Sequence, residues 1–120
     1  MLVRIGGEVK NYPWGSKNLI QDHFGLGVSD REVAEVWFGT HDGGESKIQG
    51  SNQSLSEAIG SKLSFLVKFL AAQSPLSIQV HPNSVQAKEG FAKENAAGIS
   101  LTAAERNYKD DSHKPEILIA

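Results

Sequence analysis

The strictest alternation of apolar and polar residues in this chain lies at residues 76–81. Leu76, Ile78 and Val80 alternate there with Ser77, Gln79 and His81. Successive side chains of a β-strand point to opposite faces, so the pattern predicts a strand with one aliphatic face and one polar face. Gln79 and His81 would share the polar face, with Cα atoms about 6.5–7 Å apart. Two side chains at that separation can converge on one metal ion.

The rest of the pattern predicts short strands interspersed with short helices. We expect strands at residues 2–5, 34–39, 64–70 and 117–120, and helices at residues 16–24, 54–60 and from residue 83 to about residue 92. A further helical turn is expected at residues 102–105, and turn chemistry at residues 11–15. The pattern as a whole therefore predicts a fold that is mainly β with helical additions.

Capping residues mark the ends of the predicted helices. Ser16 is expected to cap the first helix and Gly25 to end it. Ser54 and Glu57 form a capping-box sequence, with Gly60 as the stop. Asn83 is expected to cap the third helix.

Composition narrows the class of protein. The 120 residues suffice for one domain, and the formal net charge of −2 argues against nucleic acid or a membrane surface as the main partner. With no cysteine, any metal must be held by His, carboxylate or amide groups. The N-terminus lacks the pattern of a signal peptide, and the longest apolar stretch, residues 65–72, is interrupted by Lys68 and too short to span a bilayer. These features predict a cytoplasmic protein. The chain stops within an apolar stretch, so we expect it to be the N-terminal portion of a longer protein.

Candidate chemistry gathers on two segments. Gln79 and His81 on one strand, with Glu116 on a later extended segment, offer the N and O donors from which a β-barrel can build a metal site in its mouth. The alternative is an ordinary sheet with one solvated face. Lys114 shares a face with Glu116 and is either its salt-bridge partner or a working group. Lys68 in its apolar strand either extends to the surface, pairs with a glutamate, or binds an anion.

His41 and His23 are weaker candidates for a site than His81. His41 lies in a turn sequence, where a surface position or a supporting role beside a site is expected. His23 lies in a predicted helix with no carboxylate or lysine pattern around it, and we interpret it as structural.

Several segments resemble, in the right order, the type I phosphomannose isomerases. The matching pieces are Tyr12-Pro-Trp-Gly-Ser16, Ala34-Glu-Val-Trp-Phe-Gly-Thr-His41, Leu63-Ser-Phe-Leu-Val-Lys-Phe-Leu70, Pro75-Leu-Ser-Ile-Gln-Val-His-Pro-Asn83, Gly90-Phe-Ala-Lys-Glu-Asn95, Arg106-Asn-Tyr-Lys-Asp110 and His113-Lys-Pro-Glu116. They span nearly the whole chain, and the Gln-Val-His-Pro and His-Lys-Pro-Glu pieces are specific to the family.

The resemblance implies a zinc enzyme with a cupin-like jelly-roll core, of which residues 1–120 are the N-terminal part. Such enzymes interconvert mannose 6-phosphate and fructose 6-phosphate. In the family pattern the metal ligands correspond to Gln79, His81 and Glu116. Family lysines and a serine near the substrate correspond to Lys68, Lys114 and Ser77. Lys114 is then a candidate for the catalytic base, and Lys68 and Ser77 are candidates for binding the phosphate or a sugar hydroxyl. A further ligand histidine and a working arginine come from a later part of the family sequence.

Two other functions stay open on the residues alone. One is a non-enzymatic cupin that binds a sugar or a metal, and the other is an iron-dependent cupin oxygenase. The oxygenase expects two histidines and a carboxylate, so a glutamine at position 79 and a lysine beside Glu116 count against it. Residues 1–120 alone are expected to be inactive and to self-associate through unpaired strand edges.

Overall fold

The chain divides into two compact units, described here one at a time. The computed structural model describes residues 2–25, 27 and 29–120. The N-terminal unit comprises Met1–Leu76 and the C-terminal unit Ser77–Ala120. The elements in chain order are β1 (Ile5–Gly6), β2 (Glu8–Lys10), α1 (Leu19–Phe24), β3 (Glu35–Phe38), β4 (Thr40–His41), β5 (Gly44–Glu45), β6 (Lys47–Ile48), α2 (Leu55–Ile59), β7 (Val67–Leu70) and α3 (Ser84–Ala96). Strands with a few short helices are the predicted class.

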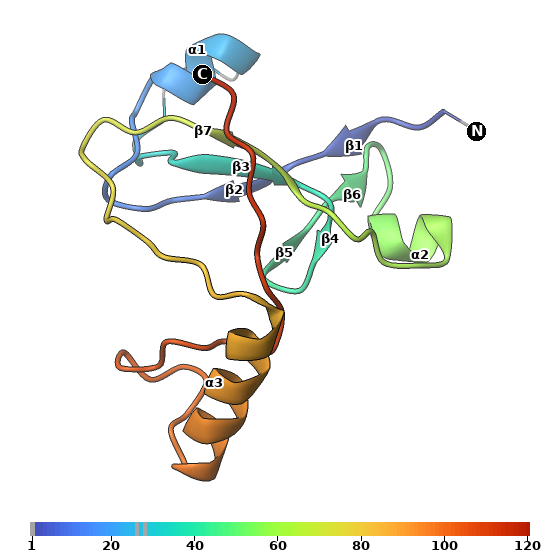
Figure 1. The fold of residues 1–120 in the computed structure, drawn as a ribbon. Helices are drawn as coiled ribbons and strands as arrows, with labels where there is room; N and C mark the ends of the chain where they lie inside the picture. Colours follow the sequence, from blue (N-terminus) through green and yellow to red (C-terminus); the bar gives the residue numbers. More distant parts are fainter. Residues whose placement is uncertain (1, 26, 28) are drawn as a thin grey trace. The chain divides into compact units, whose positions relative to one another are not determined.

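An antiparallel three-stranded sheet with the order β2-β3-β7 organises the N-terminal unit (Figure 1). Val36 on the central strand lies opposite Val9 on one side and Phe69 on the other. The buried cluster consists of Val36, Val33 and Ile20, with Phe38 and Ala71 packed against it. The central strand carries the β-branched and aromatic residues that suit a pleated, half-buried surface. Smaller two-stranded ladders join β1 to β6 and β4 to β5.

Local capping signals were the most accurate predictions. Ser54 and Glu57 form the predicted capping box of α2, and Gly60 ends this helix with a φ of 70°. Gly25 ends α1 in the left-handed conformation. The predicted start of α1 is wrong, because Asn18 and not Ser16 occupies the N-cap position. Ser16 instead bridges to Val33, although its hydroxyl still accepts the Leu19 N–H at 3.3 Å.

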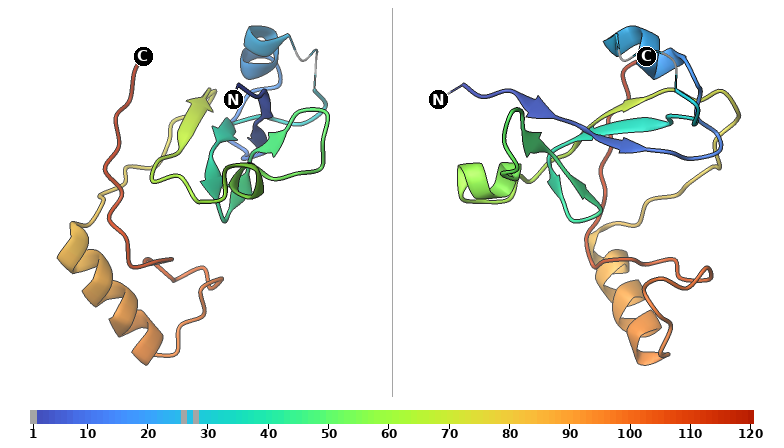
Figure 2. Two further views of the ribbon diagram at one scale, coloured as in Figure 1. Left: turned by 90° about the vertical axis from the view of Figure 1, so that its right-hand side faces the viewer. Right: turned by 180° about the vertical axis from the view of Figure 1, so that it is seen from behind.

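The C-terminal unit contains one long helix and a returning loop (Figure 2). Asn83 caps α3 as predicted, accepting the N–H groups of Val85 and Gln86. The Gln86 side chain reaches back to the Asn83 N–H, which completes a capping box. After Ala96 the chain turns back along the helix. Among the residues that the structure describes, no helix is long and apolar enough to cross a membrane.

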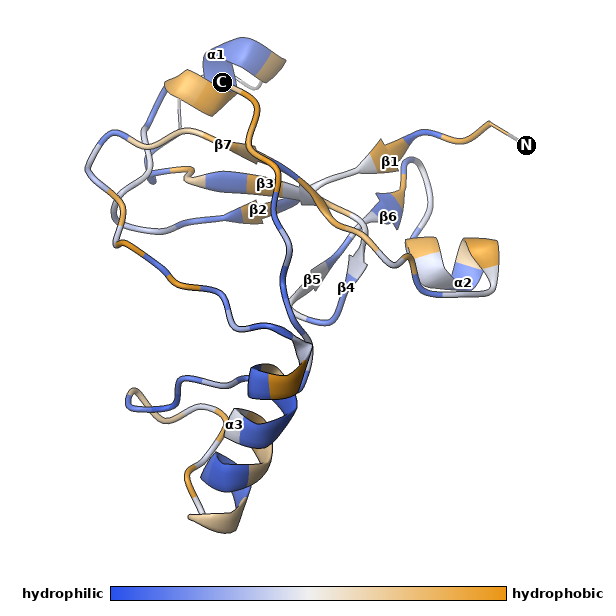
Figure 3. Ribbon diagram, in the orientation of Figure 1, coloured by the Kyte–Doolittle hydropathy of each residue, from blue (hydrophilic) through white to orange (hydrophobic). Residues whose placement is uncertain are grey.

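Several predicted strand and helix boundaries are wrong. Residues 76–81 and 117–120 are extended but are not assigned to any strand, and residues 102–105 form turns and not a helical turn. The strand expected at residues 2–5 is β1 at Ile5–Gly6, and the one expected at 64–70 is confined to Val67–Leu70. Ile78 is 98 % exposed and Ile117 is 93 % exposed. A strand exists only through its ladder, and no described residue pairs with these segments. Figure 3 shows the apolar colouring of the final residues.

Candidate functional site

His81 and Glu116 approach each other within the C-terminal unit. They come from the two extended segments that precede α3 and follow its loop. The distance from His81 Nε2 to Glu116 Oε2 is 3.5 Å, and the side chains are 31 % and 64 % exposed. Two groups that are distant in sequence therefore meet in a place that solvent and a small ligand can reach.

A hollow of about 830 Å³ adjoins His81. Its lining includes three predicted site residues, Gln79, His81 and Lys114. The other lining residues are Val80, Pro82, Gln86, Arg106, Asn107, Tyr108, Lys109, Asp110 and Ser112. Glu116 contacts this group through His81. Ser77 lies in the same extended segment as Gln79 but is not part of the lining, and its side chain is exposed.

The start of α3 positions His81. Pro82 follows His81 and biases it toward extended geometry. Asn83 then begins the helix through the capping box described above, so the direction of the chain after His81 is set by local hydrogen bonds. The cap of α3 thus supports the histidine as well as the helix.

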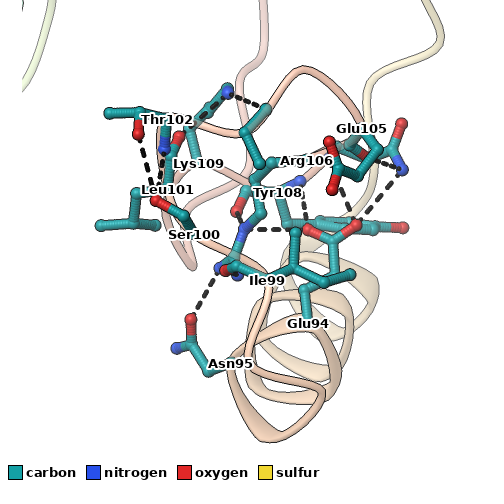
Figure 4. A network of polar contacts seen from close by, with 12 residues as sticks. Glu94, Asn95, Ile99, Ser100, Leu101, Thr102, Glu105, Arg106, Tyr108 and Lys109 are labelled. Atoms are coloured by element: carbon teal, nitrogen blue, oxygen red, sulfur yellow. Dashed lines mark hydrogen bonds and ion pairs between the residues drawn. The ribbon is translucent and has the colours of Figure 1, made fainter.

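A buried arginine ties the returning loop to α3 (Figure 4). The Arg106 side chain is 0 % exposed, and its Nε lies 2.9 Å from Glu94 Oε2. Its Nη2 donates to Asn95 Oδ1 and its Nη1 to the Ile99 carbonyl, both at 2.8 Å. The planar guanidinium presents its donors in a fixed fork, so it reaches acceptors on the helix and on the loop at once.

Glu94 on α3 also binds the returning loop, and we call the Arg106–Glu94 pair with its hydrogen bonds the polar clamp. Its carboxylate accepts the backbone N–H of Tyr108 at 2.9 Å and that of Asn107 at 3.2 Å. The hydrogen bond from the Tyr108 N–H holds the pKa of Glu94 below its ordinary value. The bonds from Asn107 and the charge of Arg106 lower this pKa further, and partial burial opposes them. The Tyr108 ring lies against Gly90 so closely that a Cβ there would come within 2.3 Å of the ring. The loop that carries Asp110 is therefore anchored at two points.

Lys114 has a different carboxylate partner from the one considered in the sequence analysis. Its Nζ lies 2.7 Å from both Asp110 Oδ1 and Asp110 Oδ2. Sequence reasoning missed Asp110 because opposite charges four residues apart are normally taken as a signal only within a helix. Arg106 and Glu94 were missed too, since their pairing depends on the loop folding back on α3.

Lys68 belongs to the N-terminal unit, on β7. Its ammonium lies over the Trp37 ring, 4.5 Å from the centroid, in a cation–π contact. The side chain is exposed. His41 lies in the β4–β5 hairpin and accepts the Gly43 N–H. The His23 ring contacts the rings of Phe24 and Phe69.

The chemistry of the donor set suits zinc. An imidazole, a carboxylate and an amide together form a borderline N/O set. Two donors held about 2.0–2.1 Å from a tetrahedral zinc ion lie roughly 3.3–3.4 Å apart, close to the 3.5 Å between His81 and Glu116. Within the described part of the chain, no three His, Asp or Glu side chains gather to hold a metal. The amide of Gln79 is thus needed for a third donor from these residues.

The chain matches a family profile described as "Phosphomannose isomerase type I, catalytic domain" over residues 2–120. It is 45 % identical over 136 residues to mannose-6-phosphate isomerase of Escherichia coli strain K12, covering 98 % of this chain and 35 % of the relative. A probable mannose-6-phosphate isomerase of Caenorhabditis elegans is 33 % identical over 140 residues, with 100 % and 31 % covered. The chain therefore spans about one third of the length of these relatives.

Solved structures give the same picture. A crystal structure of mannose 6-phosphate isomerase bound with zinc and yttrium matches at a TM-score of 0.80 and 43 % identity, covering 92 % of this chain and 33 % of that one. The Salmonella typhimurium enzyme bound to fructose 6-phosphate and zinc matches at a TM-score of 0.79 and 42 % identity, covering 93 % and 33 %. These neighbours confirm the predicted cupin-type fold class.

Proposed function

Because this chain belongs to the type I phosphomannose isomerase family, we propose that it supplies part of a zinc-dependent aldose–ketose isomerase. The reaction interconverts mannose 6-phosphate and fructose 6-phosphate. In this proposal Gln79, His81 and Glu116 hold the metal, and the fourth ligand comes from a part of the protein outside these residues. The observation that supports the ligand set is the 3.5 Å approach of His81 Nε2 to Glu116 Oε2 beside a hollow that Gln79 also lines.

The isomerisation moves a proton between C1 and C2 of the open-chain sugar, and negative charge grows on the sugar oxygens. Zinc, when bound, supplies Lewis-acid stabilisation of that charge. Lys114 lines the hollow and adds a positive charge or a proton-transfer group at the reacting end. Lys68 and Ser77 are proposed to bind the sugar phosphate through charge and hydroxyl donation.

The experiment uses a chimera in which this chain replaces the matching third of the E. coli relative, so that a complete enzyme is tested. The chimera should bind zinc and turn over mannose 6-phosphate in a coupled assay. His81→Ala should remove metal and turnover together. His113→Ala, an exposed histidine in the neighbouring motif, is the matched control and should retain both.

Lys114→Met separates the ligands from the other site residues. Because it removes no metal donor, zinc content should stay at the level of the parent chimera while turnover falls. A chimera that binds zinc and the sugar phosphate without isomerising it would instead favour the non-enzymatic cupin. Residues 1–120 alone should show no turnover, since the fourth ligand is absent from them in the family pattern.

A further inference from the structure

Asp110 holds the ammonium group of Lys114 at two points. Both carboxylate oxygens lie 2.7 Å from Lys114 Nζ, within the distance of a charge-assisted hydrogen bond. A flexible lysine stem has many rotamers, and a contact to both oxygens selects those that bring the ammonium to one place.

Asp110 is itself held by its surroundings. The Ser112 N–H donates to Asp110 Oδ1 at 2.9 Å. Two residues earlier in the chain, the carbonyl of Tyr108 accepts a 2.6 Å hydrogen bond from Arg106 Nε, and the Tyr108 N–H is bound by Glu94 (Figure 4). The backbone leading to Asp110 is thus fixed to α3, so the carboxylate is a defined anchor and not a mobile surface acid.

The pair is poorly suited to a role in stability alone. The side chains of Lys114 and Asp110 are 46 % and 44 % exposed. An ion pair this exposed contributes little to folding. Yet both residues line the same hollow as Gln79 and His81. The consequence of the pair is therefore the position of a cation beside the proposed ligands.

From these contacts we infer that Asp110 is a positioning residue, which places the Lys114 ammonium for the reaction. The inference rests on the proposed function, because it gives Lys114 a working role. Asp110 touches neither metal nor substrate in this account and acts only through Lys114. Misplacing a working group by about 1 Å can cost as much as 10²-fold in rate.

The test compares Asp110→Ala, Asp110→Glu and Lys114→Met in the chimera, with Asp111→Asn as the matched control. Asp111 is the adjacent acid, and its Oδ1 accepts a hydrogen bond from the Ser112 hydroxyl at 3.5 Å. Asp110→Ala should lower kcat at least about tenfold, with the KM for mannose 6-phosphate, the zinc content and the Tm unchanged. Asp110→Glu, which keeps the charge, should restore part of kcat, and Asp111→Asn should equal the parent.

The double variant Asp110→Ala/Lys114→Met is the decisive arm. If Asp110 acts only through Lys114, the double variant should be no slower than Lys114→Met alone. Losses that multiply, an unchanged kcat in Asp110→Ala, or a loss of zinc or Tm in that variant would each overturn the inference.

A crystal structure of the Asp110→Ala chimera separates this inference from the proposed function. Displacement of Lys114 Nζ from its place in the parent chimera supports positioning, and an unmoved Nζ overturns it. An inactive parent chimera would refute the proposed isomerase and leave this structural comparison to decide the positioning inference.

Discussion

The two units of the chain are stabilised in different ways. The N-terminal unit is stabilised by buried aliphatic residues on and beside its sheet, and Ile20, Val33 and Val36 form its hydrophobic cluster. Within residues 77–120, all of which the structure describes, the buried residues are Ala87 and Arg106. One unit therefore depends on apolar packing and the other on a polar clamp. The residues of the proposed metal site lie in the second unit, where fewer apolar contacts allow local opening.

The largest effect is expected from Arg106→Ala. Removing one partner of a buried ion pair leaves the other charge and its acceptors uncompensated, at a cost of about 3–5 kcal/mol. Hydrogen exchange in the chimera should accelerate along α3 and leave β3 protected. Lys88→Met, which alters an exposed cation on α3 itself, should change neither region. Equal acceleration of exchange in α3 and β3 would contradict the claim that the polar clamp stabilises only the C-terminal unit.

Ile20→Ala is the converse test. The side chain is 4 % exposed in the apolar cluster, so the substitution should cost about 2–4 kcal/mol. Exchange should accelerate in β3 and β7 more than in α3. Leu19→Ala provides the control, because Leu19 is 50 % exposed on the same helix and its truncation should have little effect.

Gly90→Ala tests the contact between α3 and the Tyr108 ring. The added methyl group would overlap the ring, so we expect a loss of about 1–3 kcal/mol despite the better helix propensity of alanine. In a Tyr108→Ala background the overlap is gone, and the same substitution should stabilise the helix. Thermal unfolding of the parent, Gly90→Ala, Tyr108→Ala and the double variant measures the expected loss of stability in the first background and the expected gain in the second. A loss in both backgrounds would show that the ring is not the cause.

The smallest expected effect is the loss of stability of the C-terminal unit at acidic pH. The pKa of Glu94 is lower in the folded protein than its ordinary value of 4.5. The unfolded state therefore binds more protons, so the stabilisation is complete above pH 4.5 and is lost as pH falls through the folded pKa. Exchange along α3 should accelerate over this range in the parent chimera. Glu94→Gln should remove that part of the pH dependence, and an unchanged profile would contradict the assignment.

Sequence reasoning was most accurate where the structure is local. The caps at Ser54, Asn83 and Gly25 follow from bonds between a side chain and its own turn, or from the φ that glycine permits. The strand predicted at residues 76–81 depends on a ladder partner, which local alternation cannot supply. The residue pattern offered Glu116 as a partner of Gln79 and His81 beside the alternative of a solvated sheet face, and the family resemblance favoured the metal site. The partnership of Lys114 with Asp110 had only a weak signal, since the four-residue spacing lies outside a helix.

The zinc-loaded crystal structure of the chimera tests the central claim most directly. The account predicts that one zinc ion binds Gln79, His81 and Glu116 together, with donor atoms about 2.0–2.2 Å from the metal. His113 and Asp110 should not be ligands. Zinc bound elsewhere, or held without Glu116 or Gln79, would contradict the proposed site.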